Sequence, residues 1–228
     1  MRLFIAFFAL LIPLTAQDDL AKNEALLNEA LAQNPNDANA LTKLGLLKAM
    51  TLRDQPDELR AEAEPLIERA LAIREQDPST SQADLALALE AEAHVLKEVG
   101  READASPLAA RALAIRKGIV RGMAAAPSVE PVYRVGPRDG VSAPSVIQKT
   151  DPQYAETARI GKISGTVLLS VVVDTDGTPR DIGLVRGIGF GLDEKAAEAL
   201  AQWRFRPGMM NGQPVAVRAQ VEINFRLL

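Results

Sequence analysis

The sequence predicts an α+β protein in two parts: an all-helical N-terminal region and a small C-terminal domain of order αββαβ. Residues 18–123 are rich in helix-forming Ala, Leu, Glu and Arg, with apolar residues at helical spacing. One helical stretch is repeated within this range. Residues 164–227 contain β-branched runs and a regular alternation of apolar and polar residues, both typical of strands.

The N-terminus has the pattern of an export signal. Arg2 precedes an apolar run over residues 3–14, and the small Ala16 precedes polar residues. This run is short for a membrane span of about 20 residues. We predict a signal peptide over residues 1–16, with an uncleaved inner-membrane anchor as the alternative. The mature chain would begin near Gln17 in the periplasm or another extracytoplasmic space.

The region 17–123 is predicted to form helical hairpins. Apolar periodicity between Pro- and Gly-containing breaks predicts five helices, at residues 18–33, 37–52, 57–75, 80–98 and 101–122. Residues 61–75 match residues 103–117 at 10 of 15 positions. A fixed period of this kind is typical of stacked helical hairpins, each covering the face that its neighbour leaves open.

These repeats resemble tetratricopeptide repeats. Leu41, Leu44 and Gly45 fit the first helix of that motif, and the small Ala70 and Ala112 allow close helix packing. The resemblance implies a concave peptide-binding face. A spacer or dimerisation platform, and so a possible homodimer, is the alternative.

Composition excludes several classes of site. The chain has no cysteine and a single histidine, His94, in the middle of a predicted helix. Disulfides, thiolate chemistry and histidine metal clusters are therefore excluded. We predict no catalytic residue, no cofactor, no metal and no enzyme activity. The net charge of −4 gives no reason to expect nucleic acid as a partner.

Residues 124–146 are predicted to be a linker and lead-in. Their Pro- and Gly-containing stretches are typical of loops, and 132–135 is a candidate short strand between them. We expect the second domain to begin with a loosely tethered lead-in, which forms a short hinge.

The domain 147–228 is predicted from five elements. A short helix at 154–160 precedes a buried strand at 164–173 and a returning strand at 180–186. A helix begins at Leu192 and carries Trp203 on its apolar face, and Ala216–Leu227 is the last strand. We expect a three-stranded antiparallel sheet with helices on one side. Trp203 and Phe205 are predicted to lie in the core.

This half of the chain carries a recognisable pattern of spaced residues. It comprises Asp151-Pro-Gln-Tyr154, Gly165-Thr-Val167, Asp176-Gly177, Gly191-Leu-Asp193, Trp203-Arg-Phe-Arg-Pro207 and Gly212-Gln-Pro-Val215. The pattern resembles the TonB C-terminal domain. Two turns depart from that family, since Ala155 replaces a common proline and residues 186–189 replace a Ser-Ser-Gly.

The expected sheet has exposed edges whose backbone groups can pair with an extended peptide. The resemblance implies that the last strand binds a short peptide of an outer-membrane transporter and transmits energy from inner-membrane motor proteins. On this basis five alternate residues are predicted to face the partner: Arg218, Gln220, Glu222, Asn224 and Arg226. A merely solvated strand face is the alternative for each of them.

The glycine-rich segment 187–191 lies between a strand and a helix, where a phosphate-binding loop would lie. The preceding strand belongs to an antiparallel hairpin, and no Lys-Ser/Thr pair follows. The sequence therefore does not predict nucleotide binding here.

Two functions are consistent with these patterns. The first is a TonB-family protein that binds an extended partner peptide in transmembrane transport and energy transduction. The second is a periplasmic scaffold whose repeats bind a protein partner without energy transduction.

Overall fold

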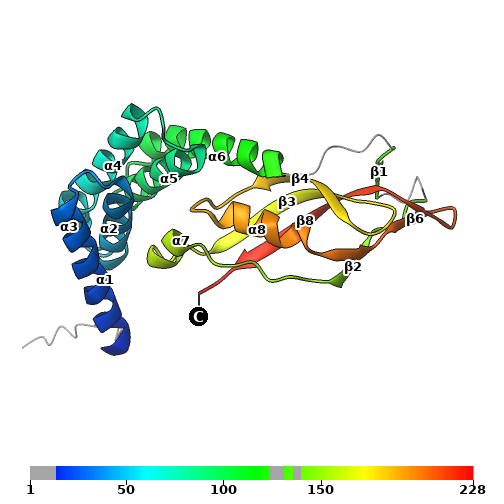
Figure 1. Cartoon of the computed structure of the whole chain (residues 1–228), viewed down its shortest axis with the longest axis horizontal. Coiled ribbons are helices and arrows are strands. Elements are labelled where there is room, and N and C mark those ends of the chain that lie inside the picture. The colour runs from blue at the N-terminus through cyan, green and yellow to red at the C-terminus, as the bar shows by residue number, and fades with distance from the viewer. Residues whose placement is uncertain (1–13, 124–130, 136–139, 228) are drawn as a thin grey trace, which may run out of the picture.

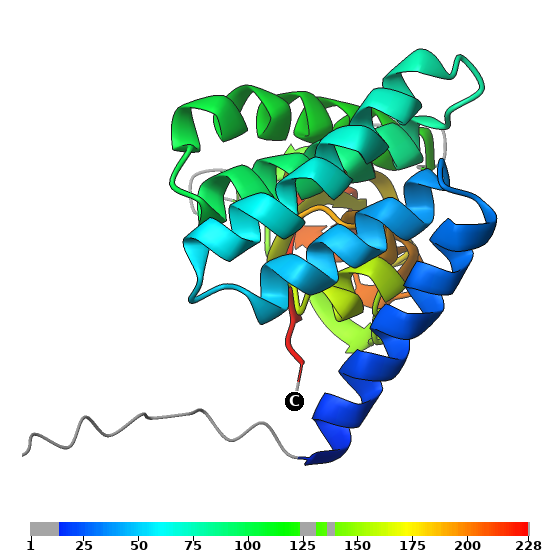
Figure 2. The same cartoon turned by 90° about the vertical axis from the view of Figure 1, so that its left-hand side faces the viewer.

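The computed structural model describes residues 14–123, 131–135 and 140–227. Helices fill the first of these ranges and strands dominate the last, which confirms the predicted α+β class. Figure 1 shows the helices arching over one end of the strand-rich domain, and Figure 2 views the same arch from its helical end. Residues 1–13 of the predicted signal peptide, and 124–130 and 136–139 of the predicted linker, lie outside the described residues.

The helical region contains six helices among the residues that the structure describes. They are α1 (Leu14–Gln33), α2 (Ala38–Thr51), α3 (Pro56–Glu62), α4 (Glu64–Gln76), α5 (Gln82–Glu98) and α6 (Glu102–Met123). Side-chain caps fix two starts: Asp37 accepts hydrogen bonds from the N–H groups of Asn39 and Ala40 at 2.9 and 3.0 Å, and Ser81 caps α5. Consecutive helices pack as hairpins. Their likeness to tetratricopeptide repeats stays a prediction.

The single helix predicted over 57–75 was wrong in one respect, because it is interrupted at Ala63 between α3 and α4. Pro65 weakens the helix at this interruption. It has no N–H to donate to the carbonyl of Ala61, and its ring crowds that carbonyl.

The described residues of the strand-rich part form two helices and eight strands. They are β1 (Tyr133–Arg134), β2 (Ser145–Gln148), α7 (Glu156–Ile160), β3 (Gly165–Val173), β4 (Pro179–Arg186), α8 (Leu192–Ala201), β5 (Arg204–Arg206), β6 (Gly208–Met210), β7 (Gln213–Val215) and β8 (Val217–Phe225).

The main sheet has the order β1-β8-β3-β4. β3 is antiparallel to both of its neighbours, and its pairing with β8 runs from Gly165↔Phe225 to Val173↔Val217. The expected three-stranded antiparallel sheet thus gains a fourth, parallel strand, β1, from the candidate strand at 132–135. Because β8 lies at the side of the three-stranded core, its unpaired backbone groups are available to β1. Two further ribbons, β2–β5 and β6–β7, are two-stranded.

The helix after the β3–β4 hairpin ends earlier than expected. α8 stops at Ala201, so Trp203 lies beyond it, in the turn into β5. Trp203 and Phe205 are nevertheless each only 5% exposed, which confirms their place in the core. The N–H of Phe205 donates to the carbonyl of Gly177 at 2.9 Å. Gly177 has φ +83°, and a Cβ there would lie 1.9 Å from the Phe205 oxygen, so this turn requires glycine.

One hydrophobic core runs through both parts of the molecule. It includes Ile67 and Val120 from the helical region together with Leu169 and Leu200 from the strand-rich domain. α6 lies along β4 and α8, and α2 contacts α7, where Lys43 pairs with Glu156 at 2.9 Å. The two parts therefore pack against each other, because apolar surface that they would expose separately is buried between them. The loosely tethered lead-in expected at 124–146 stays a prediction.

No helix within the described ranges is both long enough and apolar enough to cross a membrane.

Candidate partner-binding edge

The outer side of β8 is an edge that β1 covers only at its start. The N–H of Tyr133 donates to the carbonyl of Ala216 at 2.9 Å, so the backbone groups of Ala216 point away from β3. Backbone groups in a strand alternate in direction from residue to residue. The N–H and C=O groups of Gln220, Glu222 and Asn224 therefore point to the open side.

The five residues predicted to face a partner take three different positions along this edge. Arg218 lies beside β1, its register partner being Arg134. Gln220, Glu222 and Asn224 lie on the uncovered part of β8, opposite Ser170, Leu168 and Thr166 of β3. Arg226 lies just past the end of the strand.

The side chains of these residues lie on the solvent face of the sheet, and several are held by neighbouring strands. Arg218 donates to Asp181 at 2.6 Å, and Thr166 donates to Asn224 at 2.5 Å. Glu222 lies 3.9 Å from Arg186. Such cross-strand pairs fix the register of the face but leave the backbone edge unaffected.

The opposite face of β8 is buried and positions the edge. Ile223 and Phe225 are buried in the core, and the ring of Tyr154 meets Phe225 edge-on with centroids 5.6 Å apart. The Trp203 indole N–H donates to the carbonyl of Thr150 at 2.9 Å. β8 is therefore a strand with one buried face, one solvent-exposed face and an outer edge that no described strand covers beyond Arg218.

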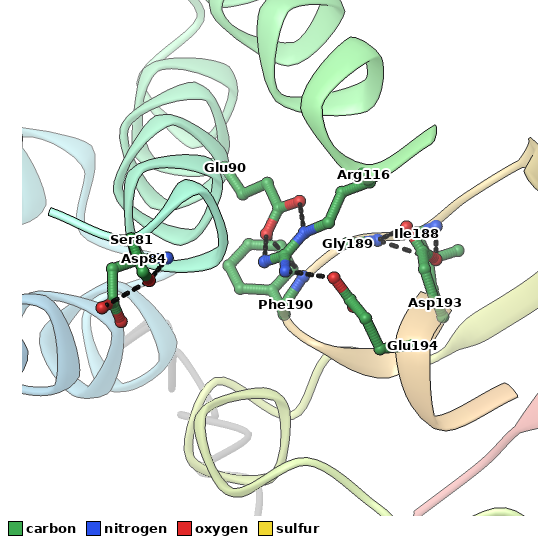
Figure 3. A network of polar contacts seen from close by, with 9 residues as sticks. All are labelled: Ser81, Asp84, Glu90, Arg116, Ile188, Gly189, Phe190, Asp193 and Glu194. Carbon is green, nitrogen blue, oxygen red and sulfur yellow. Dashed lines mark hydrogen bonds and ion pairs between the residues drawn. The ribbon is translucent and has the colours of Figure 1, made fainter. Parts of the chain in front are cut away.

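A buried polar network joins the helical region to this domain (Figure 3). Arg116 of α6 is 3% exposed and donates from Nε and Nη2 to both oxygens of Glu90 on α5, each at 2.8 Å. Its Nη1 donates to Glu194 of α8 at 2.7 Å. Glu90 also accepts the N–H of Phe190 at 2.6 Å. This network was not predicted from the sequence, where the only clue to it is a set of charged residues within otherwise apolar helical stretches.

The glycine-rich segment 187–191 donates backbone hydrogen bonds to carboxylates of the same junction. Three of its backbone N–H groups are already occupied: Ile188 and Gly189 donate to Asp193, and Phe190 donates to Glu90. Carboxylates of the chain itself thus take the place that a phosphate would need. Burial raises the pKa of Asp193 to about 6, despite the opposing effect of these two backbone donors.

His94 belongs to this junction as well. Its ring lies edge-on to Phe190 with centroids 6.0 Å apart, and burial lowers the pKa of the imidazole. Within the described ranges no three His, Cys, Asp or Glu side chains are arranged to hold a metal ion. Beside His94 a cleft of about 870 Å³ opens between α2, α5 and α6 and the loops at 161–164 and 187–190.

Comparisons with known proteins identify one part of the chain. Residues 150–227 match the family described as the C-terminal region of the Gram-negative bacterial TonB protein. Protein TonB of Vibrio cholerae is 35% identical over 89 residues, which are 38% of this chain and 36% of that protein. Protein TonB of Xanthomonas campestris is 32% identical over 77 residues, which are 33% of this chain and 34% of that protein. The matched region thus spans about a third of the length of these relatives.

A solved structure is also similar to part of this chain. The solution NMR structure of the Pseudomonas aeruginosa TonB C-terminal domain is 24% identical, covers 41% of this chain and 92% of that chain, and has a TM-score of 0.33.

Proposed function

We propose that this chain, whose residues 150–227 form a TonB C-terminal domain, binds an extended peptide of a partner protein by strand addition to β8. The observation that carries the proposal is the open edge of β8 beyond Arg218. There the backbone groups of Gln220, Glu222 and Asn224 are directed outward. Main-chain hydrogen bonds would supply the affinity, and side-chain alternation would supply the selectivity.

The geometry sets the length of the added strand. Because β1 already pairs with Val217 and Arg218, a partner strand would lie along residues 219–225. Its side chains on the solvent face would lie next to Gln220, Glu222 and Asn224. Main-chain pairing requires no charged partner, so the cross-strand pairs of Arg218 and Glu222 would remain in place.

The TonB relatives set the context of this proposal. We infer a non-enzymatic role in the cell envelope, in transport coupled to energy transduction, with an outer-membrane transporter as the partner class. Inner-membrane motor proteins are further partners if residues 1–16 are an uncleaved anchor. N-terminal sequencing of the protein from fractionated cells decides this point. A start near Gln17 in the soluble periplasmic fraction would contradict direct transduction.

A pair of substitutions at one position tests strand addition. Gln220→Pro removes an outward N–H without removing a bond to β3, so the fold should survive while the partner loses a donor. Gln220→Ala keeps the N–H and should keep binding. The measurement is photo-crosslinking in cells from a benzoyl-phenylalanine at position 222. Adducts to an envelope protein should persist with alanine and disappear with proline. Equal adducts in both variants would contradict main-chain pairing at this edge.

The scaffold function remains the second candidate, and the cleft beside His94 is the observation that favours it. A partner bound there would contact Met50 and Lys97, which line the cleft far along the chain from β8. Glutamate at both positions should abolish partner binding under this alternative and leave it intact under strand addition. Because the two parts share one core, we expect them to act as one body in either case.

A further inference from the structure

The β2–β5 ribbon is a second exposed edge in the same domain. β2 pairs with β5 from Ser145↔Arg206 to Gln148↔Arg204, and all four residues of β2 are exposed. Among the residues that the structure describes, β5 is the only strand with which β2 pairs. Its other side therefore presents backbone groups to solvent.

This edge carries apolar side chains that the core does not use. Ile147 is 66% exposed and Val146 is 43% exposed. The register shifts between Val146 and Gln148, so Ile147 is the extra residue of a bulge. Two adjacent exposed aliphatic residues on an open strand are a surface that favours a partner with apolar residues of its own.

The ribbon also carries three cations that have no ion-pair partner among the described residues. Arg204 and Arg206 alternate with the buried Phe205, so both lie on its outer face, and Lys149 directly follows β2. Within the described ranges none of these three cations forms an ion pair with a carboxylate. By contrast, Arg186 and Arg218 on the main sheet each have an acidic partner.

The groups near these cations leave their charge available for a ligand. Lys149 lies 5.1 Å from the centre of the Trp203 ring, and Arg204 donates to the carbonyl of Trp203 at 2.8 Å. Asp176 is close enough to Arg204 to feel its charge, but it accepts its two hydrogen bonds from Thr178 and forms no ion pair with the arginine. The neutral Ser145 and Gln148 lie opposite the two arginines, so long arginine side chains can reach across β2 to a strand on its far side.

We propose that the open edge of β2 binds an extended segment in which acidic and apolar residues alternate. The acidic side chains would lie on the outer face, within reach of Arg204 and Arg206, and the apolar ones beside Val146 and Ile147. The segment would add to β2 through its main chain. This site is separate from the β8 edge and does not depend on the function proposed for it.

The test uses the full chain and two capped octapeptides, one alternating Val with Glu and the other alternating Val with Lys. Binding is followed by fluorescence anisotropy, and the site is mapped by ¹⁵N amide shifts. The Val/Glu peptide should bind, shift the amides of residues 145–148, and weaken as salt is raised. The Val/Lys peptide should bind at least about tenfold more weakly, because three cations repel it.

Charge-removing variants test whether the two arginines provide the selectivity for acidic residues. Arg204→Gln with Arg206→Gln should weaken Val/Glu binding at least about tenfold. The matched control, Arg53→Gln with Arg111→Gln, removes the same charge from exposed positions of the helical region and should leave binding unchanged. Gln220→Pro should also leave it unchanged, whatever that variant does to the β8 edge.

Three outcomes would overturn the proposal. The first is equal binding of the two peptides, and the second is shifts confined to residues 219–225. The third is binding of phosphatidylglycerol vesicles through Arg204 and Arg206 without binding of the Val/Glu peptide. That result would assign the cations to an anionic membrane surface instead.

Discussion

The two copies of the internal repeat have nearly the same sequence and different structures. In the first copy, residues 61–75, the helix is interrupted between α3 and α4. In the second copy, residues 103–117, α6 is continuous. Each copy has a proline at the same place. Pro65 lies in the first turn of α4, and Pro107 lies inside α6. A proline therefore marks a weak point in a helix, and the packing around it decides whether the helix breaks there.

The same arginine of the repeat has a different role in each copy. Arg74 donates to Asn39 at 2.7 Å and lies 3.7 Å from Asp84 on α5, the helix that follows it. Arg116 is more buried and reaches Glu194 on α8. The next helix, α5, packs on the first copy. On the second copy, the strand-rich domain packs at the corresponding place. A terminal repeat needs such a cover for its open face.

The largest expected effect concerns these two arginines. Arg116→Met should destabilise the protein by about 3–5 kcal/mol, because it leaves the buried Glu90 and the partly buried Glu194 without a cation. Arg74→Met should cost about 1 kcal/mol or less, because its partners keep contact with water. Urea unfolding of both variants measures the difference.

A triple variant distinguishes charge from packing in this experiment. Arg116→Met combined with Glu90→Gln and Glu194→Gln removes the uncompensated charges and should recover part of the lost stability. Equal losses for Arg116→Met and Arg74→Met would show that the network does not hold the two parts together.

A smaller effect is expected where α2 packs on α4. A Cβ on Gly45 would lie 2.4 Å from Cδ1 of the fully buried Ile67. In the next hairpin the large and small side chains are exchanged: 42 residues further on, Leu87 stands in place of Gly45 and Ala109 in place of Ile67. Gly45→Ala should therefore cost about 1–3 kcal/mol through overpacking.

Gly118 of α6 is the matched control for that substitution. A Cβ there meets no atom within 4 Å, so Gly118→Ala should stabilise the protein by about 0.5–1 kcal/mol through helix propensity. Thermal unfolding of both variants measures the contrast. A stabilising Gly45→Ala would mean that Ile67 moves aside at no cost.

The smallest effect is a dependence on pH that only the first copy produces. Burial, together with Glu68 and Glu64 of α4 and against the opposing charge of Arg101, raises the pKa of Glu92 to about 7. One oxygen of Glu92 is buried without a hydrogen-bond partner among the described residues. The second copy has Ser106 and Ala110 in place of the two α4 glutamates.

Because the pKa of Glu92 is higher in the folded chain than the ordinary 4.5, the stability from its protonated form is complete below pH 4.5. That stability is lost as the pH rises towards 7. Glu92→Gln should match the parent near pH 4.5 and exceed it by about 1–2 kcal/mol at pH 8. Urea unfolding at the two pH values measures this, and a pH-independent difference would contradict it.

The sequence was sufficient for features that depend on local pattern. Apolar periodicity located most of the helices, the Asp176-Gly177 turn located the β3–β4 hairpin, and alternation located β8. The spaced pattern around Trp203 was enough to recognise the TonB C-terminal domain. The five residues proposed to face a partner came from that alternation, and their role stays a prediction.

Other features depended on residues far apart in the chain. Nothing local to Glu90 or Arg116 indicates that they meet Phe190 and Glu194, because hydrogen bonds across 78 or 100 residues leave no local pattern. The parallel addition of β1 and the exposed β2–β5 ribbon were missed for the same reason.

The sequence by itself located the long helices, the β3–β4 hairpin and β8, because backbone propensity and side-chain periodicity act over a few residues. Only the tertiary structure decided that the two parts share one core, that α6 lies along β4, and that β8 keeps an open edge beyond Arg218. Those outcomes depend on which buried surfaces and charges find each other in space, and that is settled when the whole chain packs.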